Sequence, residues 1–342
     1  MRHKVRRALH VAFAAGLYYS GALTLLALLR WSLRGRRPIY VLGLHRILDA
    51  EETRRSNSLP GMILSESLFV ALIEFLGRRV QFISLETLLK SDPADRKQTK
   101  PWCLVTFDDA WSDTYRRATP VLERLKIPAV VFVPTAAVGS PTGFWVEQLV
   151  GAWRSAPAPQ RMLAAEGRSI HARSGGEDFE ETIEILKHMS TEKRDAVLTG
   201  MLAQTGDAAK ESVDAMMTWE QVIEIAGRGI EIGSHTDTHP LLTFENDQTL
   251  ARELRRSREL LEDRLRAPVR AFAYPNGDWD RRVRESVIRA GYSCAFTTEA
   301  GCFENGRDRF GIPRFLLHDG NVTGLRGRFS RAMASLTLAG WC

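Results

Sequence analysis

The chain has 342 residues, of which 44% are hydrophobic and 26% charged, and its formal net charge is +6. This composition is typical of a globular body with a sizeable core and excludes a largely disordered chain. The positive charge is concentrated in two clusters, residues 2–7 and 30–37, so the rest of the chain is close to neutral. Because nucleic-acid binding is indicated by a basic stripe interleaved with aromatic residues, we expect no nucleic acid as a partner.

An uncharged segment, residues 11–29, lies between the two basic clusters. It is apolar on all sides and about long enough to cross a bilayer as a helix. Arg30 and Trp31 follow it where a signal peptide would show small residues, so it predicts an uncleaved membrane anchor within residues 1–37. The anchor implies a location at a membrane of the cell envelope, on a side that the two similar flanks leave open. The alternative is a helix packed on the domain, which the polar centre of the segment favours.

From residue 38 onward, short apolar runs alternate with amphipathic helices. Strands are expected over residues 39–44, 102–107, 128–134, 230–235, 269–275, 294–298 and 311–318. Strands joined by helices of this length pair in parallel through crossover connections. About seven such units predict a closed or nearly closed (β/α) barrel over residues 38–325, with an open doubly wound sheet as the alternative.

Residues 151–215 interrupt this alternation. They are rich in alanine, glycine, charge and helix formers and show no strand-like run, so they predict a helical insertion into the barrel. Residues 326–342 are expected to form a C-terminal tail or helix. In a barrel and in an open sheet alike, ligands bind at the carboxyl ends of the strands, so polar residues at those ends are the candidates for function.

Two polar motifs follow predicted strands. "TFDD" places Asp108 and Asp109 at the end of one strand, and "SHTDTH" places His235 and His239 at the end of another. Adjacent carboxylates repel each other unless a charge or hydrogen bonds stabilise them. Two histidines four residues apart can direct two ring nitrogens at one ion, and one carboxylate completes a set with open coordination positions. Together the motifs predict a hydrolytic metal site in which one aspartate is a ligand and the other a base.

The two motifs resemble those of the polysaccharide deacetylases, the NodB homology domain of carbohydrate esterase family 4. Further stretches that agree are "ATPVLERLKIPAVVFV", "AFAYPNG" and "AGYSCAFTTEAG", and the resemblance runs from "GLHRI" to "IPRFLLHD". It implies a distorted (β/α) barrel and a metal-dependent hydrolase of C–N bonds other than peptide bonds. The implied substrate is an N-acetylhexosamine-containing polysaccharide or glycolipid, from which N-acetyl groups are removed.

Carried over by position, the family's roles fall on five residues. Asp109, His235 and His239 resemble the metal ligands, with Zn²⁺ as the simplest divalent cation, and Asp108 resembles the general base. His318 resembles the histidine of the last family motif, Leu-x-His, which supplies the acid. A histidine that merely ends a strand is the alternative reading of His318.

The third family motif departs from its common form, in which an arginine pairs with the base. Here that position is Ala273 in "AYPNG", as in a branch with Phe-x-Tyr-Pro-x-Gly, and Arg314 is a candidate replacement unless it forms a plain structural ion pair. His45 and Arg46 end the first strand and are expected at the rim of the site. Four residues in or after the third motif are expected to contact the sugar or orient the acid: Tyr274, Pro275, Asp278 and Trp279.

Two other functions stay open. The same metal site could hydrolyse another C–N bond, such as that of a small amide or formamide, with the insertion as a lid that sets the pocket size. The barrel could instead be a non-catalytic glycan-binding protein, for which the missing third-motif arginine is the only support.

Overall fold

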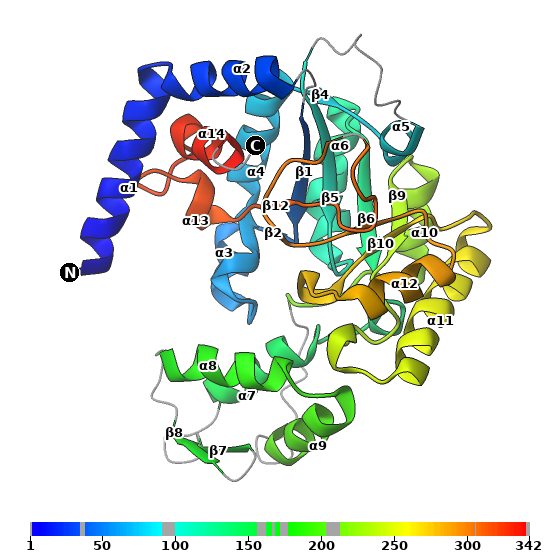
Figure 1. The fold of residues 1–342 in the computed structure, drawn as a ribbon. Helices are drawn as coiled ribbons and strands as arrows, with labels where there is room; N and C mark the ends of the chain where they lie inside the picture. Colours follow the sequence, from blue (N-terminus) through cyan, green and yellow to red (C-terminus); the bar gives the residue numbers. More distant parts are fainter. Residues whose placement is uncertain are drawn as a thin grey trace.

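The computed structural model describes residues 2–34, 38–90, 100–155, 162–165, 168–171, 177–202, 213–304 and 306–339. Its centre is a curled parallel sheet with the strand order β11-β10-β9-β6-β5-β1-β12, and β4 pairs with β5 (Figure 1). The strands are β1 (Ile39–Leu44), β4 (Gln81–Phe82), β5 (Trp102–Phe107), β6 (Ala129–Val133), β9 (Glu231–Ser234), β10 (Ala271–Ala273), β11 (Cys294–Phe296) and β12 (Phe315–Leu316). The predicted parallel α/β architecture is confirmed.

The two edges of the sheet approach each other. A parallel bridge between Phe296 and Ile312 joins β11 to the segment that leads into β12. The sheet is therefore a distorted, nearly closed barrel and not an open doubly wound sheet. The last strand is shorter than expected, because Pro313 has no backbone N–H to donate to a ladder.

Side chains alternate between two apolar layers, as they must in strands. Val105 and Val131 face outward into a core shared with the surrounding helices, and Leu104, Phe132 and Phe296 fill the barrel interior. The covering helices are α3 (Ala50–Arg55), α4 (Glu66–Gly77), α5 (Leu85–Lys90), α6 (Thr119–Leu125), α10 (Trp219–Gly227), α11 (Asp247–Leu265) and α12 (Arg281–Arg289). Smaller elements are β2 (Arg46–Leu48), β3 (Ile63–Ser65), a π-helical turn (Thr114–Ala118) and 3-10 turns at Pro60–Met62, Thr135–Ala137, Leu242–Phe244 and Pro275–Gly277.

The covering helices begin where the sequence supplies caps. The Thr218 hydroxyl accepts the N–H of Gln221 at the start of α10, and Asn246 does the same for Thr249 in α11. The Asp280 carboxylate accepts the N–H of Val283 in α12. Each cap satisfies a donor that has no partner within its helix, so the helix starts are set locally.

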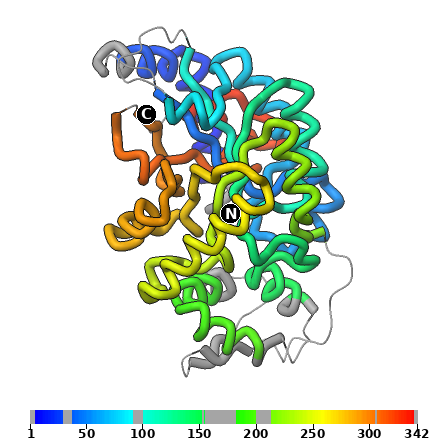
Figure 2. Tube along the Cα trace, turned by 90° about the vertical axis from the view of Figure 1, so that its right-hand side faces the viewer, coloured from blue at the N-terminus to red at the C-terminus, as the bar shows by residue number. Residues whose placement is uncertain are grey.

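The predicted helical insertion is present, but it also contains a short hairpin that was not predicted. It contains α7 (Trp145–Ser155), an antiparallel hairpin of β7 (Met162–Ala165) and β8 (Arg168–His171), α8 (Glu177–Lys187) and α9 (Thr191–Leu202). The hairpin strands contain one β-branched residue and no aromatic one, so they carry no strand pattern in sequence. Residues 156–161, 166–167, 172–176 and 203–212 of this region lie outside the described residues. Figures 1 and 2 agree in placing α7, α8 and α9 below the sheet.

The N-terminal segment is not one continuous helix over residues 11–29, which corrects the prediction. Gly21 adopts a φ of 78°, and α1 (Arg2–Tyr19) and α2 (Ala22–Arg34) meet at 67°. In the part of the chain that the structure describes, no single helix is both long and apolar enough to cross a bilayer, although the bent pair together meets both criteria. Membrane attachment stays a prediction.

The segment packs on the domain, as the alternative reading holds. Ala14 of α1 is fully buried against Ala332 and Met333 of α14 (Arg331–Ala339). Arg7 donates hydrogen bonds to the carbonyl of Gly320 and to the hydroxyl of Thr323, at α13 (Asp319–Val322) and directly after it. The predicted C-terminal tail or helix is therefore helical over α14, and α1 is bound to it.

Candidate active site

The carboxyl ends of β5 and β9 bring the two motifs together, because both strands pair with β6. The chain leaves β5 through Asp109 and Ala110, which both adopt positive φ angles of 75° and 59°. Thr236 and His239 do so after β9, at 69° and 60°. Such conformations are strained for residues other than glycine and persist where the surrounding structure holds them, as they often do at functional sites.

Asp109, His235 and His239 form a compact ligand set. The Nε2 atoms of His235 and His239 lie 3.5 and 3.4 Å from Oδ1 of Asp109, and 3.2 Å from each other. Ligand atoms about 2.0–2.2 Å from one cation are separated by roughly 3–3.5 Å. The three side chains thus have the spacing that a small divalent cation requires, and they form a candidate metal group in the described residues.

Hydrogen bonds orient two of these ligands. The Nδ1 atom of His235 lies 2.7 Å from the carbonyl of Ala273, to which it donates, so its Nε2 keeps a free lone pair toward Asp109. Trp111 donates from Nε1 to Oδ2 of Asp109 at 3.1 Å, which leaves Oδ1 for the histidines. Burial lowers the pKa of both imidazoles, so the rings are neutral and able to bind a metal.

The second aspartate is held by an arginine. Arg314 donates from both terminal nitrogens to the two carboxylate oxygens of Asp108, at 2.6 and 2.7 Å, and both side chains are buried. Burial raises the pKa of Asp108, but the guanidinium of Arg314 outweighs it and holds that pKa well below its usual range. Arg314 therefore makes the contact that was predicted for a replacement of the third-motif arginine.

Two histidines follow the neighbouring strands β1 and β12 at the same edge of the sheet. Nε2 of His45 lies 3.8 Å from Oδ2 of Asp108, and burial lowers the pKa of His45 to about 4. His318 caps α13, and its Nδ1 accepts the N–H of Gly320 at 3.1 Å. Sequence reasoning undervalued His45. The parallel register could have indicated its position: Leu44 pairs with Phe107, so the residues that follow them, His45 and Asp108, must lie side by side.

Residues 95–295 match the family model described as "Polysaccharide deacetylase", which is more than half of the chain. The chain belongs to the polysaccharide deacetylase family. The prediction of this family is confirmed.

Individual relatives are distant. The Bacillus subtilis (strain 168) protein named "Putative polysaccharide deacetylase YxkH" is 20% identical over 239 residues, and the match covers 70% of this chain but only 60% of that protein. The Streptococcus pyogenes deacetylase PplD, solved with acetate, superposes with a TM-score of 0.54 at 18% identity, over 85% of this chain and 95% of PplD. IcaB from Ammonifex degensii gives 0.52 at 21%, over 82% and 92%. At these identities the likeness shows the shared fold.

Two of the four residues expected to contact the sugar, Tyr274 and Pro275, are buried in the core of the domain. Tyr274 is fully buried, its hydroxyl donates to the carbonyl of Phe310, and Pro275 is buried beside it, so a sugar-contacting role for these two was wrong. Trp279 is half-buried and stacks on the Tyr274 ring, and Asp278 accepts a hydrogen bond from the Asn276 side chain. For Asp278 and Trp279 a role toward substrate stays a prediction.

Arg46 lies beneath the site and not at its rim, which corrects that prediction. Its guanidinium is fully buried, pairs with Asp113 at 2.7 Å and Asp214 at 2.8 Å, and lies 4.1 Å from the centre of the Trp111 ring. Trp111 in turn holds Asp109. Arg46 thus supports the metal group from behind through two contacts, which the sequence could not show because Asp214 is distant along the chain.

A buried carboxyl on α7 adjoins this cluster and predicts a pH effect on stability. Ser58 donates to Glu147 at 3.0 Å, and burial raises the pKa of Glu147 from 4.5 to about 7, against an opposing effect of Arg46. Between these two pH values the folded chain retains a proton that the unfolded chain has released. The stability that Glu147 contributes is therefore lost as the pH rises through this window.

We expect Glu147→Gln, which keeps the acceptor for Ser58 without the charge, to be more stable than wild type at pH 8 by on the order of 3 kcal/mol. At pH 4.5 the difference should be small. Urea unfolding at the two pH values measures it, and Glu184→Gln, an exposed position on α8, is the control. A gain that is the same at both pH values would contradict the assignment.

Proposed function

We propose that the chain is a metal-dependent deacetylase that hydrolyses N-acetyl groups of an N-acetylhexosamine-containing polysaccharide or glycolipid. One observation carries the proposal: a two-histidine, one-carboxylate set converges beside a second buried carboxylate, Asp108, that an arginine keeps ionised. The family membership supplies the class of reaction, and the site supplies a ligand set and a base for it.

The donor set fits a divalent cation, for which Zn²⁺ is the simplest choice. Two neutral imidazoles and one carboxylate leave coordination positions open, as hydrolytic metal sites require. Asp109 supports this fit, because burial and the neighbouring Asp108 raise its pKa well above the usual range, and a cation would offset that cost. When bound, such a cation acts as a Lewis acid that polarises a carbonyl and lowers the pKa of water.

Asp108 is the proposed general base. Arg314 keeps it unprotonated across the physiological pH range and fixes the plane of the carboxylate, since both oxygens accept from the same guanidinium. Each oxygen retains a second lone pair that can accept a proton from the attacking water. Arg314 is itself held by the carbonyl of Thr297 and the hydroxyl of Thr106, so the base is positioned on a rigid support.

Amide hydrolysis also needs an acid that protonates the leaving nitrogen, and we assign this role to His318. Because Nδ1 of His318 accepts the N–H of Gly320, Nε2 carries the proton of the neutral ring. Donation to the leaving nitrogen requires the imidazolium form, in which Nδ1 is also protonated and its hydrogen bond to Gly320 is given up. The acid role leads to a prediction that separates His318 from His45.

His318→Ala should lower the turnover of an N-acetylated oligosaccharide by about 10²–10⁴-fold. Hydrolysis of 4-nitrophenyl acetate should change little, because nitrophenolate leaves without a proton. His45→Ala is the matched control, since its imidazole lies beside Asp108 and should affect both substrates alike. If only His45→Ala shows the selective loss, His45 is the acid and the assignment to His318 fails.

A substrate panel tests the proposed reaction itself. The full chain with added Zn²⁺ is incubated with chito-oligosaccharides that carry N-acetyl, N-formyl or O-acetyl groups, and with cell-envelope glycans. We expect release of acetate with the appearance of free amino groups on the N-acetyl substrates. Turnover confined to N-formyl substrates would replace the proposal with a deformylase activity.

A further inference from the structure

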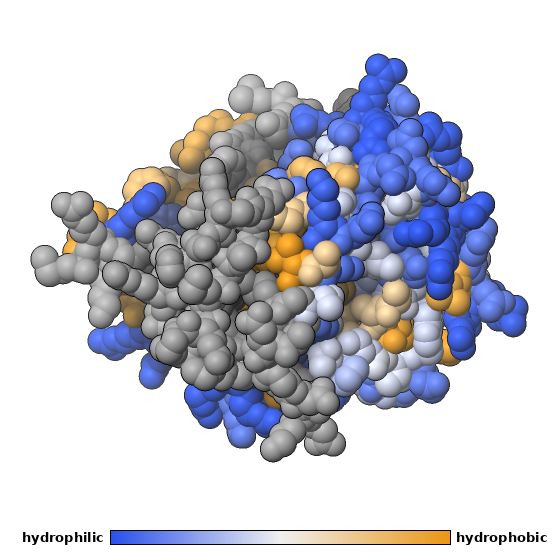
Figure 3. Space-filling model, turned by 90° about the horizontal axis from the view of Figure 1, so that it is seen from below, coloured by the Kyte–Doolittle hydropathy of each residue, from blue (hydrophilic) through white to orange (hydrophobic). Residues whose placement is uncertain are grey.

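The outer sides of α1 and α2 expose an unusual amount of apolar surface. Of the thirteen large hydrophobic side chains that are exposed in the described part of the chain, eight lie within residues 5–29. They are Val5, Leu9, Phe13, Tyr19, Leu25, Leu26, Leu28 and Leu29, here called the α1–α2 patch. Single exposed hydrophobic residues are ordinary, but a cluster of this kind marks an interaction surface. By contrast, the coloured residues on the face below the sheet are mainly hydrophilic (Figure 3).

Helix α1 is apolar on two opposite sides, and the fold uses only one of them. The inner side packs on α14 through residues spaced three and four apart: Val11, Ala14, Ala15 and Tyr18. Val5, Leu9 and Phe13 recur every four residues on the other side and are 54–67% exposed. A helix that is buried on one side only has no structural need for a second apolar stripe.

The charge of this segment complements an anionic surface. Residues 1–37 contain eight of the 47 basic residues and none of the 41 acidic ones. The rest of the chain therefore has 39 basic against 41 acidic residues, a net charge of −2. Amphipathic helices with this combination of apolar side chains and lysine or arginine bind at the interface of bilayers that contain anionic lipids.

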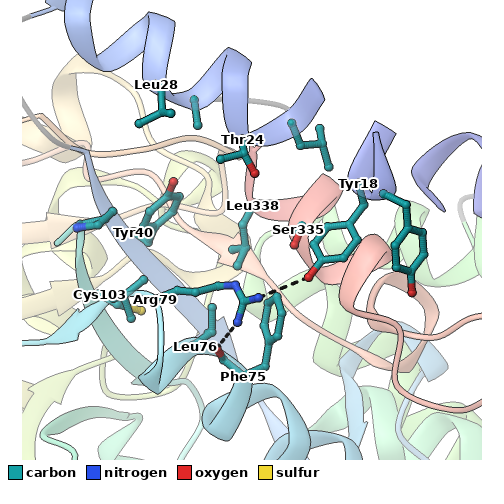
Figure 4. Close-up of a pocket in the computed structure, with 15 residues that line it drawn as sticks. Tyr18, Thr24, Leu28, Tyr40, Phe75, Leu76, Arg79, Cys103, Ser335 and Leu338 are labelled. Atoms are coloured by element: carbon teal, nitrogen blue, oxygen red, sulfur yellow. Dashed lines mark hydrogen bonds between the residues drawn. The ribbon is translucent and has the colours of Figure 1, made fainter. Parts of the chain in front are cut away.

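A cavity of about 520 Å³ adjoins the α1–α2 patch (Figure 4). It lies between α2 and the strand starts at Tyr40 and Cys103, the end of the barrel opposite to the candidate metal group. Its lining is mainly apolar, and the exposed residues Tyr19 and Leu28 form part of it. Arg79 reaches across its wall to donate to the hydroxyl of Tyr18 at 3.3 Å. The apolar surface thus continues from the patch into the cavity. Flexible lipid chains can enter such a cavity, whereas the flat face of a partner protein cannot.

We propose that α1 and α2 form a docking surface that lies in the interface of an anionic lipid bilayer without crossing it. A span would require α1 to leave α14, to break the hydrogen bonds of Arg7 and to straighten the 67° bend at Gly21. Docking through the outer sides keeps all three features. This attachment does not depend on the chemistry of the candidate active site.

Sedimentation with lipid vesicles tests the surface on the full chain. We expect binding to vesicles of phosphatidylcholine with phosphatidylglycerol, weak binding to phosphatidylcholine alone, weakening by salt and release by alkaline carbonate. The quadruple variant Leu9→Glu, Phe13→Glu, Leu25→Glu, Leu29→Glu should bind at least about tenfold more weakly. Ile223→Glu with Ile288→Glu, on α10 and α12 with 42% and 39% exposure, is the control. Circular dichroism verifies that each variant is folded.

Three results would overturn the proposal. Retention of the full chain in carbonate-washed vesicles would show a helix that spans the bilayer. Absence of vesicle binding, together with a dimer in analytical ultracentrifugation that the quadruple variant abolishes, would show that a second copy of the chain covers the patch. An equal loss of binding in the Ile223 and Ile288 control would show a general charge effect.

Discussion

Asp108→Asn should lower the turnover of an N-acetylated substrate by about 10³-fold while a divalent metal still binds. The change removes the buried carboxylate that Arg314 holds beside the metal group, and it leaves Asp109, His235 and His239 in place. Turnover by acetate release and metal content by mass spectrometry of the native protein measure the two effects. Comparable turnover in the variant would show that another group takes the proton.

The structural cost of this change needs a control, because Arg314 would remain buried without its anionic partner. The double variant Asp108→Asn, Arg314→Met removes both charges and should recover much of the stability that the single change loses. It should recover none of the activity. Activity that returned together with stability would mean that Asp108 has only a structural role.

Arg314→Met should destabilise the fold by about 3–5 kcal/mol, because it leaves a buried carboxylate without its partner. Chemical denaturation at pH 7 measures the effect. The matched control is Arg284→Met, whose two hydrogen bonds to Asp308 have the same bidentate form but lie at the surface. The control should cost about 1 kcal/mol or less. Similar losses of folding stability in the two variants would contradict the claim that burial makes the Arg314–Asp108 pair costly to break.

The same variant should shift the pH dependence of activity. In wild type the pKa of Asp108 is depressed, so the stability from its ion pair is present above the usual aspartate pKa of about 3.9 and is lost as the pH falls. Without Arg314 burial dominates and raises that pKa. The acidic limb of the pH–rate profile of Arg314→Met should therefore move to higher pH, a change that a merely destabilised protein would not show.

The barrel and the metal group could be predicted from the sequence because each rests on local patterns. Apolar runs and amphipathic helices alternate, so the sheet is parallel, and parallel strands deliver their following residues to one edge. Asp109 and His235 follow β5 and β9 and must therefore converge, whatever the details of packing. The caps of α10, α11 and α12 are equally local.

The remaining features depend on tertiary contacts that no local pattern carries. The sequence suggests a position at the rim for Arg46, because it follows β1, but its partner Asp214 comes from the end of the insertion, 168 residues further along the chain. The break between α1 and α2 depends on the backbone conformation of Gly21 and on the packing of α1 against α14. Tyr274 is placed in the core by the carbonyl of Phe310, which lies on a distant loop.

Arg314 bears on the function as well as on the fold. The only support for a non-catalytic barrel was the missing arginine of the third motif, whose position is Ala273 here. The structure supplies a guanidinium to Asp108 from the segment before β12 instead, while the backbone of Ala273 orients His235. The departure in sequence thus preserves the contact between base and arginine, and the support for the non-catalytic alternative is removed.

The most direct test of the central claim is a metal titration of activity. Chelator-treated full chain should release no acetate from N-acetylated chito-oligosaccharides, and activity should rise with Zn²⁺ and level off near one equivalent. His235→Ala, His239→Ala double variants should show neither that stoichiometry nor the activity. Unchanged acetate release by wild type under chelation, with no metal found in the protein, would contradict a metal-dependent deacetylase at this site.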